Sequence, residues 1–87
     1  MQLFVAGTDS TGHWMAHTSY ALCKNPEVLK KLRAEVDAKI DSLEDLTFDK
    51  LNSMKYLSAC IKETLRLYPP TPEPFTREAL DDHYLGN

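Results

Sequence analysis

The chain has 87 residues, with 10 Lys plus Arg against 13 Asp plus Glu and a formal net charge of −3. This length is enough for one small domain or for a part of a larger one. Hydrophobic residues make up 43% and charged residues 26%, which argues against wholesale disorder. The slight acidity and the lack of a basic stripe argue against a nucleic-acid partner.

The two cysteines, Cys23 and Cys60, lie far apart and form no zinc, redox or covalent haem pattern. We expect both to be reduced thiols that pack as small hydrophobic side chains. The apolar run at residues 3–6 has no basic segment before it, and Asp9 follows it closely. It therefore predicts neither a signal peptide nor a membrane span.

Residues 2–23 predict a helix with a weak point at residues 7–12, where Gly, Thr, Asp and Ser gather. Such a cluster inside a helix predicts a kink or a widened turn. The alternative is that residues 7–12 are simply a loop.

Three further helices follow. Asn25-Pro26 is a helix start signal, with Asn as the N-cap and Pro in the first position, for a helix over 26–40. Thr47 begins a short helix over 47–52, and the last helix covers 54–68 before two prolines stop it. Apolar stripes at helical spacing predict the buried faces of the two longer helices: Val28, Leu29, Leu32, Val36 and Ile40, then Leu57, Ile61, Thr64, Leu65 and Tyr68.

The tail, residues 69–87, carries four of the five prolines and is expected to be extended. Residues 75–78 are a candidate short strand, and residues 85–87 predict a turn that would open a hairpin. The fold class expected is therefore mainly α, with an extended tail that includes a short β segment.

Three groups of side chains are candidates for catalytic or binding chemistry. Asp9, Ser10 and Thr11 stand beside the small pair Ala6-Gly7, where a flat ligand can approach the backbone and where hydroxyls and an acid can relay protons. A polar helix kink that satisfies its own hydrogen bonds is the alternative explanation.

The second group is Glu63 and Arg66, which share a helix face at i, i+3 and can form an ion pair. The third is Asp9, His13 and His17, which follow one another at four-residue spacing on one helix face. His-x-x-x-His is a metal-ligand spacing, although it often occurs by chance.

In this order, the motifs resemble a known family. F-V-A-G-T-D-S-T at residues 4–11 resembles the oxygen-activation motif [AG]-G-x-[DE]-T-[TS] of the cytochromes P450, which are haem-thiolate monooxygenases. N-P-E at residues 25–27 resembles the start of that family's next helix. E-T-L-R-L-Y-P-P at residues 63–70 resembles its E-x-x-R helix. The resemblance covers residues 3–87 and a central slice of the family's longer chain.

This resemblance implies that 2–23 is part of the I helix, 26–40 the J helix and 54–68 the K helix. It implies that Ala6 and Gly7 line the haem pocket and that Asp9, Ser10 and Thr11 belong to the proton relay. Ser10 stands where Thr is usual, so it keeps the hydroxyl and loses the methyl group that restricts its rotamers.

The resemblance also implies that Glu63 and Arg66 form the structural pair of the K helix. Residues 71–75 would contact the substrate, and Arg77 would pair with a haem propionate.

The family's cofactor is haem, and its iron ligand comes from an F-x-x-G-x-R-x-C-x-G loop that these 87 residues do not contain. Neither cysteine has that context, so we expect no metal ligand here, no retained haem and no catalysis by the chain alone. The resemblance implies a parent protein that oxidises a small organic substrate with dioxygen and electrons from NADPH through a reductase. It also implies contact with the rest of the domain and, for a eukaryotic parent, the cytosolic face of the endoplasmic reticulum. Alternatives are a small helical interaction or metal-binding module and an inert truncated product.

Overall fold

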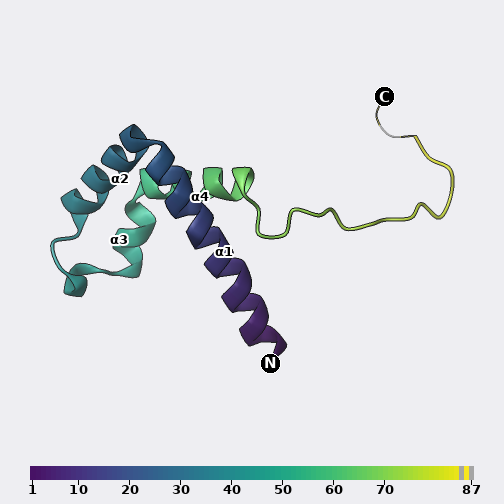
Figure 1. Cartoon of the computed structure of the whole chain (residues 1–87), viewed down its shortest axis with the longest axis horizontal. Coiled ribbons are helices and arrows are strands. Elements are labelled where there is room, and N and C mark those ends of the chain that lie inside the picture. The colour runs from purple at the N-terminus through teal and green to yellow at the C-terminus, as the bar shows by residue number, and fades with distance from the viewer. Residues whose placement is uncertain (85, 87) are drawn as a thin grey trace.

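A computed structural model describes residues 1–84 and 86. Within them lie α1 (Gln2–Lys24), α2 (Pro26–Lys39), the short 3-10 turn η1 (Leu43–Asp45), α3 (Phe48–Ser53) and α4 (Lys55–Leu67) (Figure 1). No strand occurs among the described residues. The mainly α class expected from the sequence is therefore confirmed.

The first helix, α1, is α-helical throughout, so a loop or a widened turn at residues 7–12 was the wrong expectation. The hydroxyls of Thr8 and Ser10 donate to the carbonyls of Phe4 and Ala6, four residues earlier. The side chains thus bond to the helix that they were expected to disrupt. Gly7 and Gly12 have negative φ, as ordinary helical residues do.

The turn between α1 and α2 depends on Asn25, which has the N-cap position that the sequence predicts. Its side chain acts differently from a usual N-cap, because Nδ2 donates to the carbonyl of Ala21 at 2.8 Å and closes the end of α1. The backbone carbonyl of Asn25 accepts from the amides of Val28 and Leu29 at 3.0 and 3.1 Å. Pro26 occupies the first turn of α2, where its missing N–H costs nothing.

The short helix α3 begins as the sequence indicates. Thr47 is its N-cap, and the Thr47 hydroxyl accepts from the amide of Lys50 at 3.3 Å. Before it, the acidic connector forms η1, and Asp45 at its end pairs with Lys50 at 3.0 Å. Met54 then joins α3 to α4.

The helices α1, α2 and α4 pack against one another in pairs. Met54, at 1% exposure, is the buried apolar side chain of the described residues, and Thr64 is the buried polar one at 5%. The predicted stripes are half-buried or buried in α2 and α4 with one exception. Leu65 is 42% exposed, so its inclusion in the buried face of α4 was wrong.

After α4 the chain is extended, and Figure 1 shows the tail leading away from the helices. Residues 75–78 form no strand, so the prediction of a short strand there was wrong. A strand requires a neighbouring strand to complete its hydrogen bonds. The turn expected at 85–87 falls largely on Leu85 and Asn87, which lie outside the described residues.

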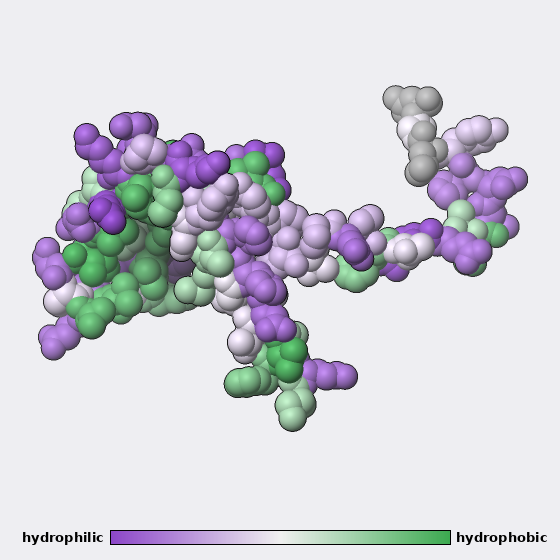
Figure 2. All heavy atoms as spheres, viewed as in Figure 1, coloured by the Kyte–Doolittle hydropathy of each residue, from purple (hydrophilic) through white to green (hydrophobic). Residues whose placement is uncertain are grey.

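Much apolar surface lies open. Figure 2 shows hydrophobic residues at the free N-terminal end of α1 and along the side formed by α2 and α3. The Cα radius of gyration is 18.2 Å, whereas a compact domain of this length would have about 12 Å. The most exposed apolar side chains of the helical part are Met1, Leu3, Phe4, Leu43 and Phe48.

We therefore expect the isolated chain to unfold over a broad temperature range and to bind an apolar dye, because exposed apolar surface of this kind favours association. Far-UV circular dichroism during heating would measure the unfolding, the fluorescence of the added dye would measure its binding, and size-exclusion chromatography would measure association. A sharp, cooperative transition in a monodisperse monomer would contradict it.

Candidate functional site

The expected relay residues lie on the N-terminal half of α1, which projects beyond the helices that pack against its other half (Figure 1). Ala6, Gly7, Asp9 and Thr11 are exposed, and Ser10 is half-buried. A Cβ added to Gly7 would meet nothing within 4 Å, so no neighbour within the described residues requires glycine there. This surface of α1 is therefore open.

A hollow of about 130 Å³ adjoins the relay residues. Ser10, Thr11 and Trp14 of α1 line one side of it, and Leu65 and Pro70 line the other. Nothing local in the sequence pairs α1 with the end of α4, so this neighbourhood could not be predicted from the sequence. The structure thus brings Ser10 and Thr11 close to the Pro-Pro segment.

Trp14 and Thr64 connect α1 to α4. The indole Nε1–H of Trp14 donates to the Thr64 hydroxyl oxygen at 3.1 Å, and that hydroxyl lies 3.0 Å from the carbonyl oxygens of Cys60 and Ile61. Thr64 can therefore accept from the indole while it donates within its own helix. The pair lies one turn of α1 after Ser10.

A second contact between the same helices follows one turn later. The rings of His17 and Tyr68 are stacked, with centroids 5.2 Å apart and planes 4° from parallel. Within the described residues no group of three or more His, Cys, Asp or Glu could hold a metal ion. The Asp9, His13 and His17 pattern is thus not assembled as a metal site.

Glu63 and Arg66 form the ion pair that the spacing predicts. Arg66 donates twice, from Nε to Oε2 of Glu63 at 2.8 Å and from its terminal nitrogen to Oε1 at 2.7 Å. These hydrogen bonds lower the pKa of Glu63 and raise that of Arg66. Both side chains are more than half exposed, so the pair contributes little stability by itself. It is open to a further charged partner.

Arg77 is exposed in the extended tail, which leads away from α1 (Figure 1). The structure therefore does not bring Arg77 together with Ala6 and Gly7.

The cysteines differ in environment. Cys23 is exposed near the end of α1 and Cys60 is half-buried in α4, and both are free. Desolvation raises the pKa of the Cys60 thiol, and the negative charge of Glu35 raises it further. Since a metal binds the thiolate, this environment works against Cys60 as an iron ligand.

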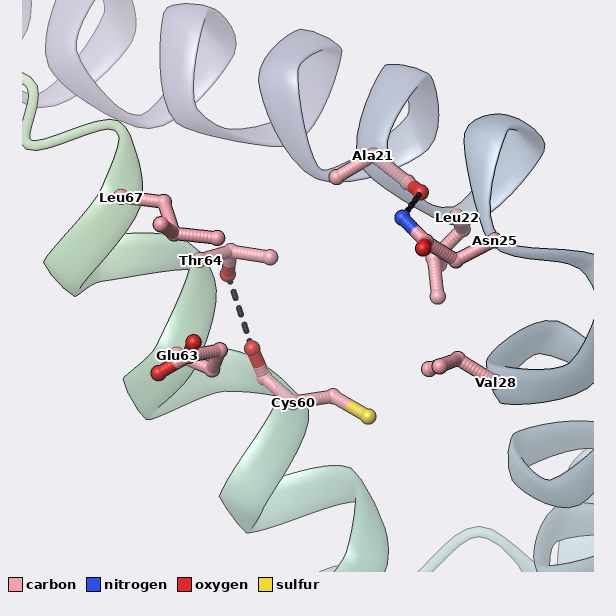
Figure 3. Close-up of a pocket in the computed structure, with 8 residues that line it drawn as sticks. All are labelled: Ala21, Leu22, Asn25, Val28, Cys60, Glu63, Thr64 and Leu67. Carbon is pink, nitrogen blue, oxygen red and sulfur yellow. Dashed lines mark hydrogen bonds between the residues drawn. The ribbon is translucent and has the colours of Figure 1, made fainter.

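A larger cavity of about 250 Å³ lies between the end of α1, the start of α2 and the face of α4 (Figure 3). Its lining is mostly apolar. Figure 3 shows the Cys60 thiol and the Val28 side chain on opposite sides of this cavity. Ala21, Leu22, Asn25, Val28, Cys60, Glu63, Thr64 and Leu67 line it.

The model of the cytochrome P450 family matches residues 1–87. The chain is 44% identical over 68 residues to a cytochrome P450 monooxygenase, FUM2, of Gibberella moniliformis, covering 78% of this chain and 14% of that protein. It is 49% identical over 71 residues to a putative cytochrome P450, CYP13A3, of Caenorhabditis elegans, with the same coverage. It is 38% identical over 86 residues to cytochrome P450 71B34 of Arabidopsis thaliana, covering 99% of this chain and 17% of that protein.

The chain therefore belongs to the cytochrome P450 family, and it spans about a sixth or less of the length of these relatives. No solved structure matches it significantly. Among the described residues, none of the helices has both the length and the hydropathy needed to cross a membrane.

The Trp14–Thr64 hydrogen bond can be tested with Thr64→Val, which keeps the shape of the side chain and removes the acceptor. We expect the population with α1 docked on α4 to fall about fivefold, because a lost hydrogen bond of this kind costs about 1 kcal/mol. The indole N–H resonance and the fluorescence of Trp14, the single tryptophan, would report it. Thr64→Ser, which keeps the hydroxyl, should retain the docked signal. Equal effects of the two substitutions would contradict this role.

Proposed function

We propose that these residues form the distal wall and part of the scaffold of a haem-dependent monooxygenase. The whole protein would oxidise a small organic substrate, using dioxygen and electrons that a reductase takes from NADPH. The observation that carries the proposal is the family match over residues 1–87, which includes both the relay motif on α1 and the Glu63–Arg66 pair on α4.

The residues of α1 fit one face of a haem. Ala6 and Gly7 have little or no side chain, and the space beside Gly7 is open, so a flat ring can lie close to the helix backbone. The two cysteines do not fit the role of an iron ligand. Burial raises the pKa of the Cys60 thiol, which works against its binding iron as a thiolate, and Cys23 lies near the C-terminal end of α1, on the half opposite to Ala6 and Gly7. The thiolate must come from residues outside these 87.

Haem, when bound, would supply the binding and activation of dioxygen. The part proposed for α1 is proton delivery. The exposed carboxyl of Asp9 can exchange protons with water. The Ser10 hydroxyl, which donates to the Ala6 carbonyl in this structure, can turn toward the distal side, give its proton there and take another from water. Thr11 offers a second hydroxyl next to it.

The proposal assigns the remaining residues to support. Glu63 and Arg66 would form a network with a further charged side chain, for which their exposed, bidentate pair is suited. Arg77 would pair with a haem propionate once the tail folds against the rest of the domain, and residues 71–75 would contact the substrate. We propose that the whole monooxygenase lies at the cytosolic face of the endoplasmic reticulum.

We also propose that the 87 residues alone do not catalyse monooxygenation. When the purified chain is mixed with haem, reduced and exposed to carbon monoxide, we expect no thiolate-type Soret band, because these residues contain no F-x-x-G-x-R-x-C-x-G loop and because burial raises the pKa of the Cys60 thiol. Appearance of that band would overturn this, and Cys23→Ser and Cys60→Ser would then identify the sulfur responsible.

The monooxygenase itself is tested with the coding sequence that flanks these residues. We expect it to encode an in-frame F-x-x-G-x-R-x-C-x-G loop, and the product of the whole frame to give the thiolate-type band. In that product, Ser10→Ala should lower the rate of product formation about a hundredfold, as expected for loss of a positioned proton donor. Ser10→Thr, which restores the hydroxyl, is the matched control. A whole-frame product with no thiolate-type band would refute the proposed function.

A further inference from the structure

The helix α4 begins without a cap of its own. Met54 occupies its N-cap position and provides no side-chain hydrogen bond, and the first turn has no acidic residue. The first amides of a helix have no carbonyl partners within that helix. Met54 is 1% exposed and Tyr56 and Leu57 are half-buried, so the amides of this first turn lie where access of water is reduced.

Glu35 of α2 supplies the missing acceptors. Its Oε1 accepts from the amide of Tyr56 at 3.1 Å, and its Oε2 accepts from the amide of Leu57 at 2.8 Å. Each carboxylate oxygen thus serves one amide of the first turn. The negative charge also lies at the positive end of the α4 dipole, where it is favourable. Glu35 is half-buried in this position.

Lys39, one turn later on α2, holds the other side of the same junction. Its Nζ donates to the carbonyl of Ser53 at 2.7 Å and lies 2.9 Å from the Ser53 hydroxyl oxygen. Ser53 is the last residue of α3. The two side chains of α2 therefore contact the end of α3 and the beginning of α4, on either side of the buried Met54.

We infer that Glu35 is a positioning residue: from α2 it fixes where α4 begins, and it thereby places Thr64 and Glu63 about two turns further along. Thr64 in turn holds Trp14, so the effect extends to α1. The inference concerns the assembly of α4 and needs no haem, so its failure would leave the proposed monooxygenase function standing.

The hydrogen bond from the amide of Tyr56 is the main cause that lowers the pKa of Glu35, and the amide of Leu57 and the charge of Lys39 lower it as well, against the opposing effect of desolvation. A lowered pKa means that the carboxylate stabilises the fold above its unfolded value of about 4.5, and that this contribution is lost as the pH falls through the lower, folded value. Lys39 on α2 and Cys60 on α4 are in charge interaction with it. Ammonium groups and thiols do not titrate in the acid range.

The test is an NMR titration of the ¹⁵N-labelled 87-residue chain from about pH 7 to about pH 2. We expect the amide protons of Tyr56 and Leu57 to follow the titration of the Glu35 carboxyl. E35Q should abolish that titration and speed the hydrogen exchange of these two amides about fivefold to tenfold, the effect of losing a helix cap. E35D keeps a carboxyl with a shorter reach, so it should speed the exchange of the two amides as E35Q does, and the amide protons should not follow the titration of the new carboxyl.

The matched control is D37N, which makes the same carboxyl-to-amide change two residues away at an exposed position of α2. It should leave the exchange of Tyr56 and Leu57 within about twofold, well below the effect of losing a cap. The emission of Trp14 provides a second readout, and we expect E35Q to shift it to the red while D37N does not. Amides of Tyr56 and Leu57 that fail to follow Glu35, or equal effects of E35Q and D37N, would overturn the inference.

Discussion

The carboxylate of Glu35 at the start of α4 is the contact on which the arrangement of the helices depends. A helix that begins beside a buried Met54 needs acceptors for its first amides, and α4 has none in its own sequence. Glu35 provides two of them from α2. Once α4 is fixed in this way, Thr64 lies where the Trp14 indole can donate to it, and α1 joins the same assembly.

This arrangement divides α1 into two parts. Trp14, His17 and the residues near the C-terminal end of α1 contact α4 or the start of α2. The part before them carries Ala6, Gly7 and Asp9 on an open surface. The contacts of the C-terminal half of α1 hold its N-terminal half at a fixed angle. This arrangement suits a helix whose backbone is proposed to face a flat ligand. The proposed relay depends on that rigidity as much as on its own hydroxyls.

The hydroxyl side chains of α1 form hydrogen bonds within the helix. Those of Thr8, Ser10 and Thr18 bond to carbonyls four residues earlier. The sequence correctly indicates that Ser and Thr hydroxyls form hydrogen bonds with nearby backbone groups. It does not indicate that the helix remains intact when they do so. The Ser10 hydroxyl donates to the carbonyl of Ala6, beside the surface that we propose to face the haem.

The sequence by itself determined the helical class, the stops at Pro69-Pro70, the Thr47 cap, the Glu63–Arg66 pair and the family. Each of these signals joins residues within about one turn of one another, or is a motif read directly from the chain. Only the tertiary structure decided that Glu35 caps α4, that Trp14 meets Thr64 and that residues 75–78 form no strand. The partners of Glu35 lie 21 and 22 residues away and that of Trp14 lies 50 away, and a strand needs a distant neighbour. Local spacing carries no information about which distant groups packing brings together.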